Sequence, residues 1–170
     1  MEPVKVVIAG PSGAGKSTLV RAIADLTVRS TDAAGTMFDL GRITIGRDLT
    51  LYLYGAPAEP EIDGWPRLSS GMLGSIVVVD ALRPDGAVNA LPHVRWFGNQ
   101  AAPMLVAANR CPNEAVAVLA GQLGVARDSV IALDCAARVD VRNLVIAVLE
   151  KALTAVTPSA VSLEIAARLG

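Results

Sequence analysis

The stretch GPSGAGKST, residues 10–18, contains the residue types that can hold a phosphate group. Gly10, Gly15, Lys16 and Ser17 occupy every fixed place of the pattern G-x-x-x-x-G-K-[ST]. Glycines let backbone N–H groups turn toward a β-phosphate, the ammonium of Lys16 can act between the β- and γ-phosphates, and the Ser17 hydroxyl can bind Mg²⁺. We therefore expect phosphate binding, with Lys16 also a candidate catalytic residue, along the segment Ser12, Gly13, Ala14, Gly15, Lys16, Ser17 and Thr18.

Other residues that could do chemistry are few. Asp80 ends the apolar run IVVVD and could hold Mg²⁺ through water. His93 is the only histidine and has no Ser or Cys partner at a recognisable spacing, so a structural role is expected. Cys111 and Cys135 lie far apart without zinc-ligand spacing, which argues against a zinc site or a disulfide and favours a reducing, cytoplasmic location.

The composition limits the class of protein. The 170 residues fit one domain, and 52% apolar with 4% aromatic residues indicates an α/β core of Val, Ala, Leu and Ile. Lys and Arg number 15 against 16 Asp and Glu, without a basic block, so we expect no nucleic-acid partner and no membrane-surface patch. The apolar runs are shorter than a signal peptide or a membrane span requires, so we expect neither, and no lipid anchor.

The phosphate loop lies between elements that can position it. Residues 4–9 read as a buried strand, and a helix should begin at Lys16 with Leu19, Ile23 and Leu26 on its core face. Residues 27–36 are small and polar and are predicted to be a loop. The alternating segments 41–46 and 48–55 predict a β-hairpin, and therefore an antiparallel pair in a parallel sheet.

The remaining chain alternates strands and helices. Residues 55–66 contain three prolines and two glycines and are predicted to be irregular. Strands are expected at 74–81, 103–109 and 129–135, with helices at 86–97, 113–124 and 140–156, the last capped by Asp140. The result is a three-layer fold of about six strands, with one domain over 1–156 and a tail or short helix over 157–170.

Four segments resemble a known family. They are VKVVIAGPSGAGKSTLV, FDLGRITIGRDLTLYLYGAP, GMLGSIVVVD and PMLVAANR, which are similar to the bacterial Ras-like small GTPases encoded beside roadblock-domain proteins, relatives of the gliding-motility GTPase. The resemblance covers about residues 4–153. It implies a G domain that binds GDP or GTP with Mg²⁺, hydrolyses GTP slowly, and meets a roadblock-type (LC7) regulator through its switch I and switch II loops.

Both switch loops depart from the family pattern. In switch II, GAPAE places Ala58 where the family has the glycine that senses the γ-phosphate, and Glu59 where a glutamine would orient water. A carboxylate there repels the negative charge that builds up during hydrolysis, so weak hydrolytic activity is expected. Glu59 is a candidate catalytic residue, but the role of an ordinary surface acid is favoured for it. In switch I, alignment on Asp39 puts Gly35 at the family's metal-binding threonine, which leaves Thr36 as the candidate Mg²⁺ ligand.

Base recognition departs furthest. The family motif is Asn-Lys-x-Asp, and NRCP keeps Asn109, has Arg110 for the lysine, and has Pro112 where the guanine-binding Asp should be. Arg110 could lie along the base, and the backbone N–H groups of Cys135 and Ala136 could read the guanine carbonyl. Losing the charged acceptor costs about 1.5 to 3 kcal/mol, so preference for guanine over adenine should fall at least about tenfold.

Two other functions therefore stay open. One is a pseudo-GTPase scaffold that binds nucleotide weakly, or only GDP, and acts through its surface; the three departures favour it. The other is an ATP-dependent P-loop kinase using Asp80, which the hairpin and the absence of an Arg-rich lid disfavour. Trp65, in the switch II region, is either a partner anchor or a packing residue.

Overall fold

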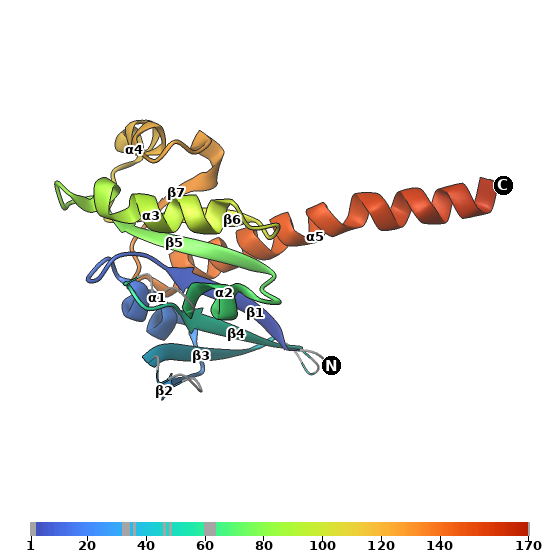
Figure 1. Cartoon of the computed structure of the whole chain (residues 1–170), viewed down its shortest axis with the longest axis horizontal. Coiled ribbons are helices and arrows are strands. Elements are labelled where there is room, and N and C mark those ends of the chain that lie inside the picture. The colour runs from blue at the N-terminus through green and yellow to red at the C-terminus, as the bar shows by residue number, and fades with distance from the viewer. Residues whose placement is uncertain are drawn as a thin grey trace.

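The computed structural model describes residues 3–31, 35, 37–45, 47, 49–59 and 64–169, with side chains described as far as residue 155. The chain begins with a strand and a helix, continues with three consecutive strands, and then alternates helices and strands (Figure 1). Their bounds are β1 Val4–Ala9, α1 Lys16–Ile23, β2 Leu26–Thr31, β3 Met37–Ile45, β4 Leu49–Gly55, α2 Gly64–Ser69, β5 Gly74–Asp80, α3 Gly86–Gly98, β6 Met104–Asn109, η1 Asn113–Ala115, α4 Val116–Leu123, η2 Arg127–Ser129, β7 Val130–Leu133 and α5 Arg138–Leu169.

The strands form one mixed sheet in the order β2-β3-β4-β1-β5-β6-β7. The pairs β4-β1, β1-β5, β5-β6 and β6-β7 are parallel, and β3 pairs antiparallel with both β2 and β4. The predicted α/β class and the antiparallel hairpin are thus confirmed. Because the carboxyl ends of β1, β5 and β6 lie at one edge of the sheet, the loops that follow them meet there.

The prediction of six strands was wrong by one, because residues 27–31 belong to β2 rather than to a loop. β2 is an edge strand whose residues are almost all exposed, so its sequence lacks the apolar run that marks a buried strand. Its pairing with β3, with Val28 opposite Leu40, supplies the hydrogen bonds that hold it. Leu26 opens this strand and is 50% exposed, so its predicted place on the core face of α1 was also wrong.

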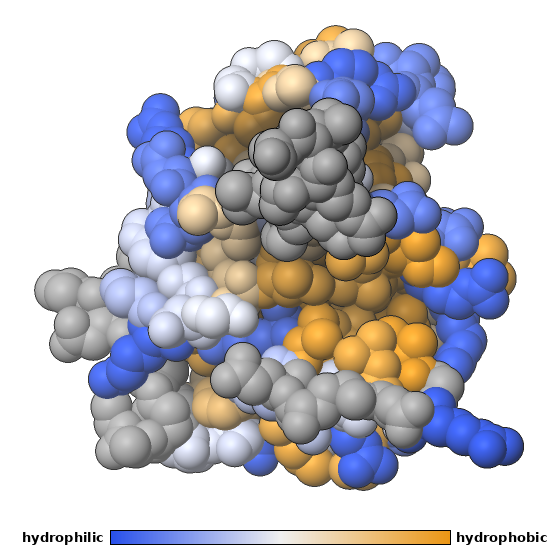
Figure 2. Space-filling view, turned by 90° about the vertical axis from the view of Figure 1, so that its right-hand side faces the viewer, coloured by the Kyte–Doolittle hydropathy of each residue, from blue (hydrophilic) through white to orange (hydrophobic). Residues whose placement is uncertain are grey.

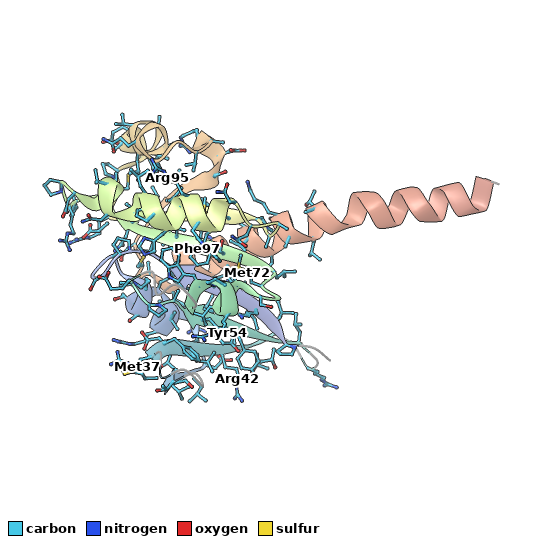
Figure 3. The ribbon with its side chains drawn as sticks, viewed as in Figure 1. Met37, Arg42, Tyr54, Met72, Arg95 and Phe97 are labelled. Atoms are coloured by element: carbon cyan, nitrogen blue, oxygen red, sulfur yellow. The ribbon has the colours of Figure 1, made fainter. Side chains whose placement is uncertain are left out.

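Helices cover both faces of the sheet and make two cores. One core lies under α1 and α5 and includes Leu19, Leu53 and Leu144. The other lies under α2, α3 and α4 and includes Trp65 and the fully buried Phe97 (Figure 3). All residues of β5 are buried, as expected for the central strand of a sheet that is packed on both faces. This rigid centre carries the phosphate loop at its edge.

The last helix, α5, runs without a break from Arg138 to Leu169 and projects beyond the sheet (Figure 1). Asp140 lies in its first turn, where its carboxylate accepts a hydrogen bond from the Asp134 N–H, and is therefore not the N-cap that was predicted. Among the residues of α5 whose side chains are described, those up to residue 155, Ala152 is the last that is buried in the core. Figure 2 looks at the side from which α5 projects and shows apolar side chains, in orange, gathered on this face. Pro103 and Ala147 line a pocket at the base of the helix.

None of the helices in the described part of the chain combines the length and apolar character that crossing a bilayer requires.

Candidate phosphate and nucleotide site

The phosphate loop turns sharply because three of its glycines adopt positive φ. Gly10, Gly13 and Gly15 have φ of 141°, 75° and 117°. A Cβ on Gly10 would lie 2.4 Å from the Val78 carbonyl oxygen, so only glycine lets the loop pass this close to β5. A Cβ on Gly15 would likewise meet the Asn109 amide nitrogen at 2.8 Å. The motif glycines are thus required by close contacts with β5 and β6.

Several N–H groups of the loop have no acceptor within the described chain. The Ala14 N–H donates to the Pro11 carbonyl at 3.3 Å, whereas the N–H groups of Gly13 and Gly15 meet no acceptor among the described residues. Gly15 precedes α1 without a side-chain cap, and the first N–H groups of any helix lack intrahelical acceptors. Unpaired donors at a helix N-terminus favour an anion such as a phosphate.

Lys16 places its ammonium group across this loop. Its Nζ donates to the carbonyl oxygens of Gly10 at 2.6 Å and Pro11 at 2.9 Å. Burial lowers the pKa of Lys16 to about 8, and the negative charge of Asp39 acts in the opposite direction. A half-buried cation held beside unpaired N–H groups can neutralise a bound phosphate.

Ser17 meets a carboxylate that comes from the hairpin. Its hydroxyl donates to Asp39 Oδ2 at 2.5 Å, and Asp39 also accepts from Arg29 Nε at 3.4 Å. Asp39 lies opposite Gly55 in the β3-β4 ladder, where a Cβ on Gly55 would lie 3.3 Å from the Asp39 Cβ. A hydroxyl and a carboxylate are oxygen ligands of the kind Mg²⁺ prefers. The sequence offered Asp39 only as an alignment anchor, and its contact with Ser17 was missed.

The other predicted metal and loop residues are placed as follows. Thr18 is exposed on α1 and Ser12 is exposed at the tip of the loop, while Ala14 is buried. Thr36, the candidate Mg²⁺ ligand, lies outside the described residues. Within the described chain, no group of three or more His, Cys, Asp or Glu side chains could hold a metal. A divalent ion at this site would therefore depend on Ser17, Asp39 and the oxygens of a bound phosphate.

Asn109 joins the phosphate loop to the loop after β7. Its Nδ2 donates to the Ala14 carbonyl at 3.1 Å, and its Oδ1 accepts from the Cys135 N–H at 3.0 Å. The Ala136 N–H donates to Asp134 Oδ1 at 2.8 Å. Both N–H groups that were expected to read a base therefore have acceptors inside the chain. Burial raises the pKa of the Cys135 thiol to about 12, so this cysteine is not a nucleophile.

Arg110 and Asp80 form an ion pair that sequence reasoning did not predict. The Arg110 guanidinium donates to Asp80 Oδ2, although it was expected to lie along a base. Asp80 Oδ1 accepts the Leu82 N–H at 3.1 Å, and Asp80 is only 3% exposed. Both carboxylate oxygens thus have partners within the protein. Pro112, which follows Arg110 closely, begins the turn of η1 and offers no side-chain acceptor.

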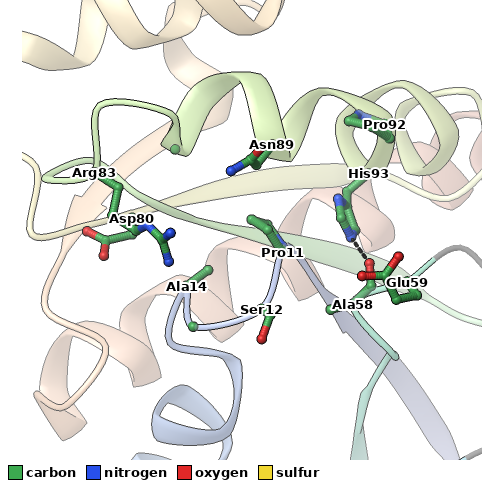
Figure 4. Close-up of a pocket in the computed structure, with 12 residues that line it drawn as sticks. Pro11, Ser12, Ala14, Ala58, Glu59, Asp80, Arg83, Asn89, Pro92 and His93 are labelled. Atoms are coloured by element: carbon green, nitrogen blue, oxygen red, sulfur yellow. Dashed lines mark hydrogen bonds between the residues drawn. The ribbon is translucent and has the colours of Figure 1, made fainter.

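A cavity of about 580 Å³ opens between the phosphate loop, the end of β4 and α3 (Figure 4). His93 Nε2 donates to the Ala58 carbonyl at 3.0 Å across its rim. Desolvation lowers the pKa of the buried His93, although the hydrogen bond with Ala58 acts to raise it. The lining residues are Pro11, Ser12, Gly13, Ala14, Ala58, Glu59, Asp80, Arg83, Gly86, Asn89, Pro92 and His93.

The arrangement matches structures of known G domains. The G domain of the T. maritima FeoB iron transporter superposes with a TM-score of 0.64 at 20% identity, covering 89% of this chain and 99% of that one. The Arl6 small GTPase of Trypanosoma brucei, with bound GppNp, superposes with a TM-score of 0.66 at 15% identity, covering 90% and 99%. This chain has the G-domain fold.

A longer structure gives the same result. The cytosolic domain of T. maritima FeoB in its GDP form superposes with a TM-score of 0.66 at 20% identity over 89% of this chain. This chain spans 64% of that cytosolic domain. No family model and no curated protein sequence matches the chain.

Helix α2, which follows β4, packs on α3 through Trp65. Trp65 is 4% exposed, its ring lies 4.8 Å from that of His93 and 5.5 Å from that of Phe97, and its Nε1 donates to the Pro57 carbonyl at 3.3 Å. Of the two roles considered for Trp65, the structure supports packing. Glu59 remains exposed at the cavity, close to Ala58.

Proposed function

We propose that this protein is a small regulatory nucleotide-binding protein of the GTPase type, which binds GDP or GTP with Mg²⁺ and hydrolyses GTP slowly or not at all. The observation that carries the proposal is the phosphate loop, in which unpaired N–H groups and the Lys16 ammonium face the same turn. The guanine nucleotides in the structures of FeoB and Arl6 support the choice of ligand.

Each part of the site would have a separate task. The N–H groups of Gly13 and Gly15 would bind the phosphate chain, and Lys16 would move from the Gly10 and Pro11 carbonyls to the phosphate oxygens. Ser17 and Asp39 would hold Mg²⁺, which supplies positive charge to the phosphate oxygens. The expected Thr36 ligand would be added from switch I.

Slow hydrolysis follows from the composition of switch II. Glu59 lies at the cavity beside Ala58, where a carboxylate opposes the negative charge that develops on the phosphoryl group. As a base it could accept a proton from water, but electrostatic opposition should dominate. We therefore assign Glu59 a minor role, and infer that substantial turnover requires a residue supplied by a partner.

A pseudo-GTPase scaffold is a second candidate, favoured by the base-binding loops. Arg110 is engaged with Asp80, Pro112 provides no acceptor, and the N–H groups of Cys135 and Ala136 are already paired. Guanine would then be held weakly, and the protein would act through its surface. A kinase that uses Asp80 for Mg²⁺ is disfavoured, because both oxygens of that carboxylate are engaged within the chain.

By family resemblance, we infer that the regulator is a roadblock-type protein that contacts the two switch loops, and that the protein works in the cytoplasm. No other class of macromolecule is proposed as a partner. Co-purification of the tagged chain with such a regulator, in the presence of GDP or a GTP analogue, would test the assignment.

Calorimetric titration with GDP, GTP, ADP and ATP in Mg²⁺, followed by a phosphate-release assay, tests the proposed function. We expect binding of GDP and GTP, weaker binding of the adenine nucleotides, and release of phosphate far slower than in a competent GTPase. Lys16→Ala should abolish nucleotide binding. Binding by this variant as tight as by the wild type, or a preference for ATP with phosphate transfer, would refute the proposal.

A further inference from the structure

The cavity beside the phosphate loop carries an unbalanced set of charges. Among the described residues that line it, Arg83 alone has a permanent positive charge, and Asp80 and Glu59 are the acids. The cavity runs from the loop toward Ala58, the side on which a terminal phosphate orders switch II in G domains. A phosphate entering it would meet the carboxylate of Glu59, and would need a compensating cation.

Arg83 is placed to supply that cation. It follows β5 and precedes α3, and its side chain folds back over the phosphate loop (Figure 4). Its Nη1 lies 3.5 Å from the position that a Cβ on Gly13 would occupy. The N–H group of Gly13 is one of the unpaired donors of the loop. Arg83 therefore lies beside the phosphate loop on the α3 side, whereas Lys16 lies beside it on the α1 side.

The neighbouring acids leave the guanidinium of Arg83 weakly held. Asp80 is paired with Arg110 and with the Leu82 N–H, so its charge is already compensated. Arg83 Nε contacts Asp85 Oδ1 at 3.4 Å, and the two side chains are 51% and 56% exposed. Asp85 is also bound by Asn89 Nδ2 at 2.8 Å. An exposed ion pair of this kind contributes little to stability. Arg83 can therefore give up its contact with Asp85 for a stronger, charge-assisted contact with a phosphate.

We propose that Arg83 binds the terminal phosphate of a nucleoside triphosphate and makes the site discriminate triphosphate from diphosphate. This inference rests on the proposed function and goes beyond it, because it assigns the γ-phosphate contact to a residue of the β5-α3 connection rather than to the phosphate loop or the switch loops. A guanidinium can form two parallel hydrogen bonds to phosphate oxygens. The last phosphate of a diphosphate would stay in the phosphate loop and would not reach the guanidinium of Arg83.

The test is calorimetric titration of the full chain with GDP and with GMPPNP, both in Mg²⁺. Arg83→Ala should weaken GMPPNP binding by about tenfold or more, as expected for a lost charge-assisted hydrogen bond, and change GDP binding by less than about twofold. Arg83→Lys should retain part of the GMPPNP affinity, because the charge remains. Arg95→Ala is the matched control, since Arg95 is exposed on α3 and does not line the cavity (Figure 3).

The outcomes separate this inference from the function on which it rests. If the wild type binds neither ligand, both fall. If the wild type binds GDP and GMPPNP, and Arg83→Ala either binds GMPPNP as tightly as the wild type or loses both ligands equally, the role of Arg83 is refuted while the proposed function stands. Circular-dichroism melting of each variant ensures that any loss of binding is compared between folded proteins.

Discussion

The carboxylate of Asp80 at the end of β5 is bound by the guanidinium of Arg110 at the end of β6. The two residues follow adjacent parallel strands, since Asp80 lies opposite Asn109 in the ladder. Arg110 reaches this position with a positive φ of 58°, and its N–H donates to the Leu133 carbonyl at 3.0 Å. The pair and this backbone hydrogen bond thus tie together the carboxyl ends of β5, β6 and β7.

Arg110→Ala should destabilise the protein by about 2 kcal/mol, because it leaves the buried Asp80 carboxylate without its cation. The loss of stability is smaller than for a fully buried ion pair, since the Arg110 side chain is 52% exposed. Urea denaturation at pH 7 measures the change. The double variant Asp80→Asn with Arg110→Ala should recover most of the stability, since no charge then remains buried. Equal loss in the single and double variants would show that the ion pair is not the cause.

Asp39→Asn should reduce the Mg²⁺ dependence of nucleotide binding. Mg²⁺ raises the nucleotide affinity by some factor in the wild type, and we expect this factor to be about tenfold or more smaller in the variant. The reason is that a charged oxygen ligand next to Ser17 is removed. Titrations with GMPPNP in Mg²⁺ and in EDTA give this difference. Asp128→Asn, at an exposed position in η2, is the control and should behave as the wild type. An unchanged ratio in Asp39→Asn would exclude Asp39 from the metal site.

Nucleotide binding at pH 8 should take up protons. Lys16 has a pKa of about 8, so it is about half protonated before binding, and a bound phosphate raises this pKa. The affinity should therefore be full below pH 8 and decline as the pH rises above it. Titration of GDP in buffers of different ionisation enthalpy at pH 8 should report uptake of about half a proton. No uptake would mean that Lys16 does not contact the phosphates.

Stability should fall as the pH drops below about 6.5, because of His93. The pKa of His93 is lowered from 6.5 in the folded protein, so the unfolded chain binds a proton first. At pH 5.5 this term reduces the free energy of unfolding by at most about 1.4 kcal/mol. His93→Gln keeps a donor for the Ala58 carbonyl and has no group that titrates in this range. The free energy of unfolding should therefore depend on pH more steeply in the wild type than in the variant between pH 7.5 and 5.5. Parallel slopes would contradict the prediction.

The sequence by itself determined the elements that depend on local pattern. The apolar runs of β1, β5 and β6 are buried strands as predicted, because a central strand must be apolar on both faces. The phosphate loop was likewise readable, since its glycines, Lys16 and Ser17 are consecutive and their conformations follow from residue type. The predicted phosphate chemistry rests on nine consecutive residues, GPSGAGKST.

Only the tertiary structure decided which side chains meet across the sheet. Ser17 and Asp39 are 22 residues apart, Asp80 and Arg110 are 30 apart, and Ala58 and His93 are 35 apart. Sequence spacing carries no signal for such pairs, because strand order and register bring them together. The edge strand β2 was missed for the same reason: its residues are mostly exposed and form no continuous apolar run, and pairing with β3 makes them a strand.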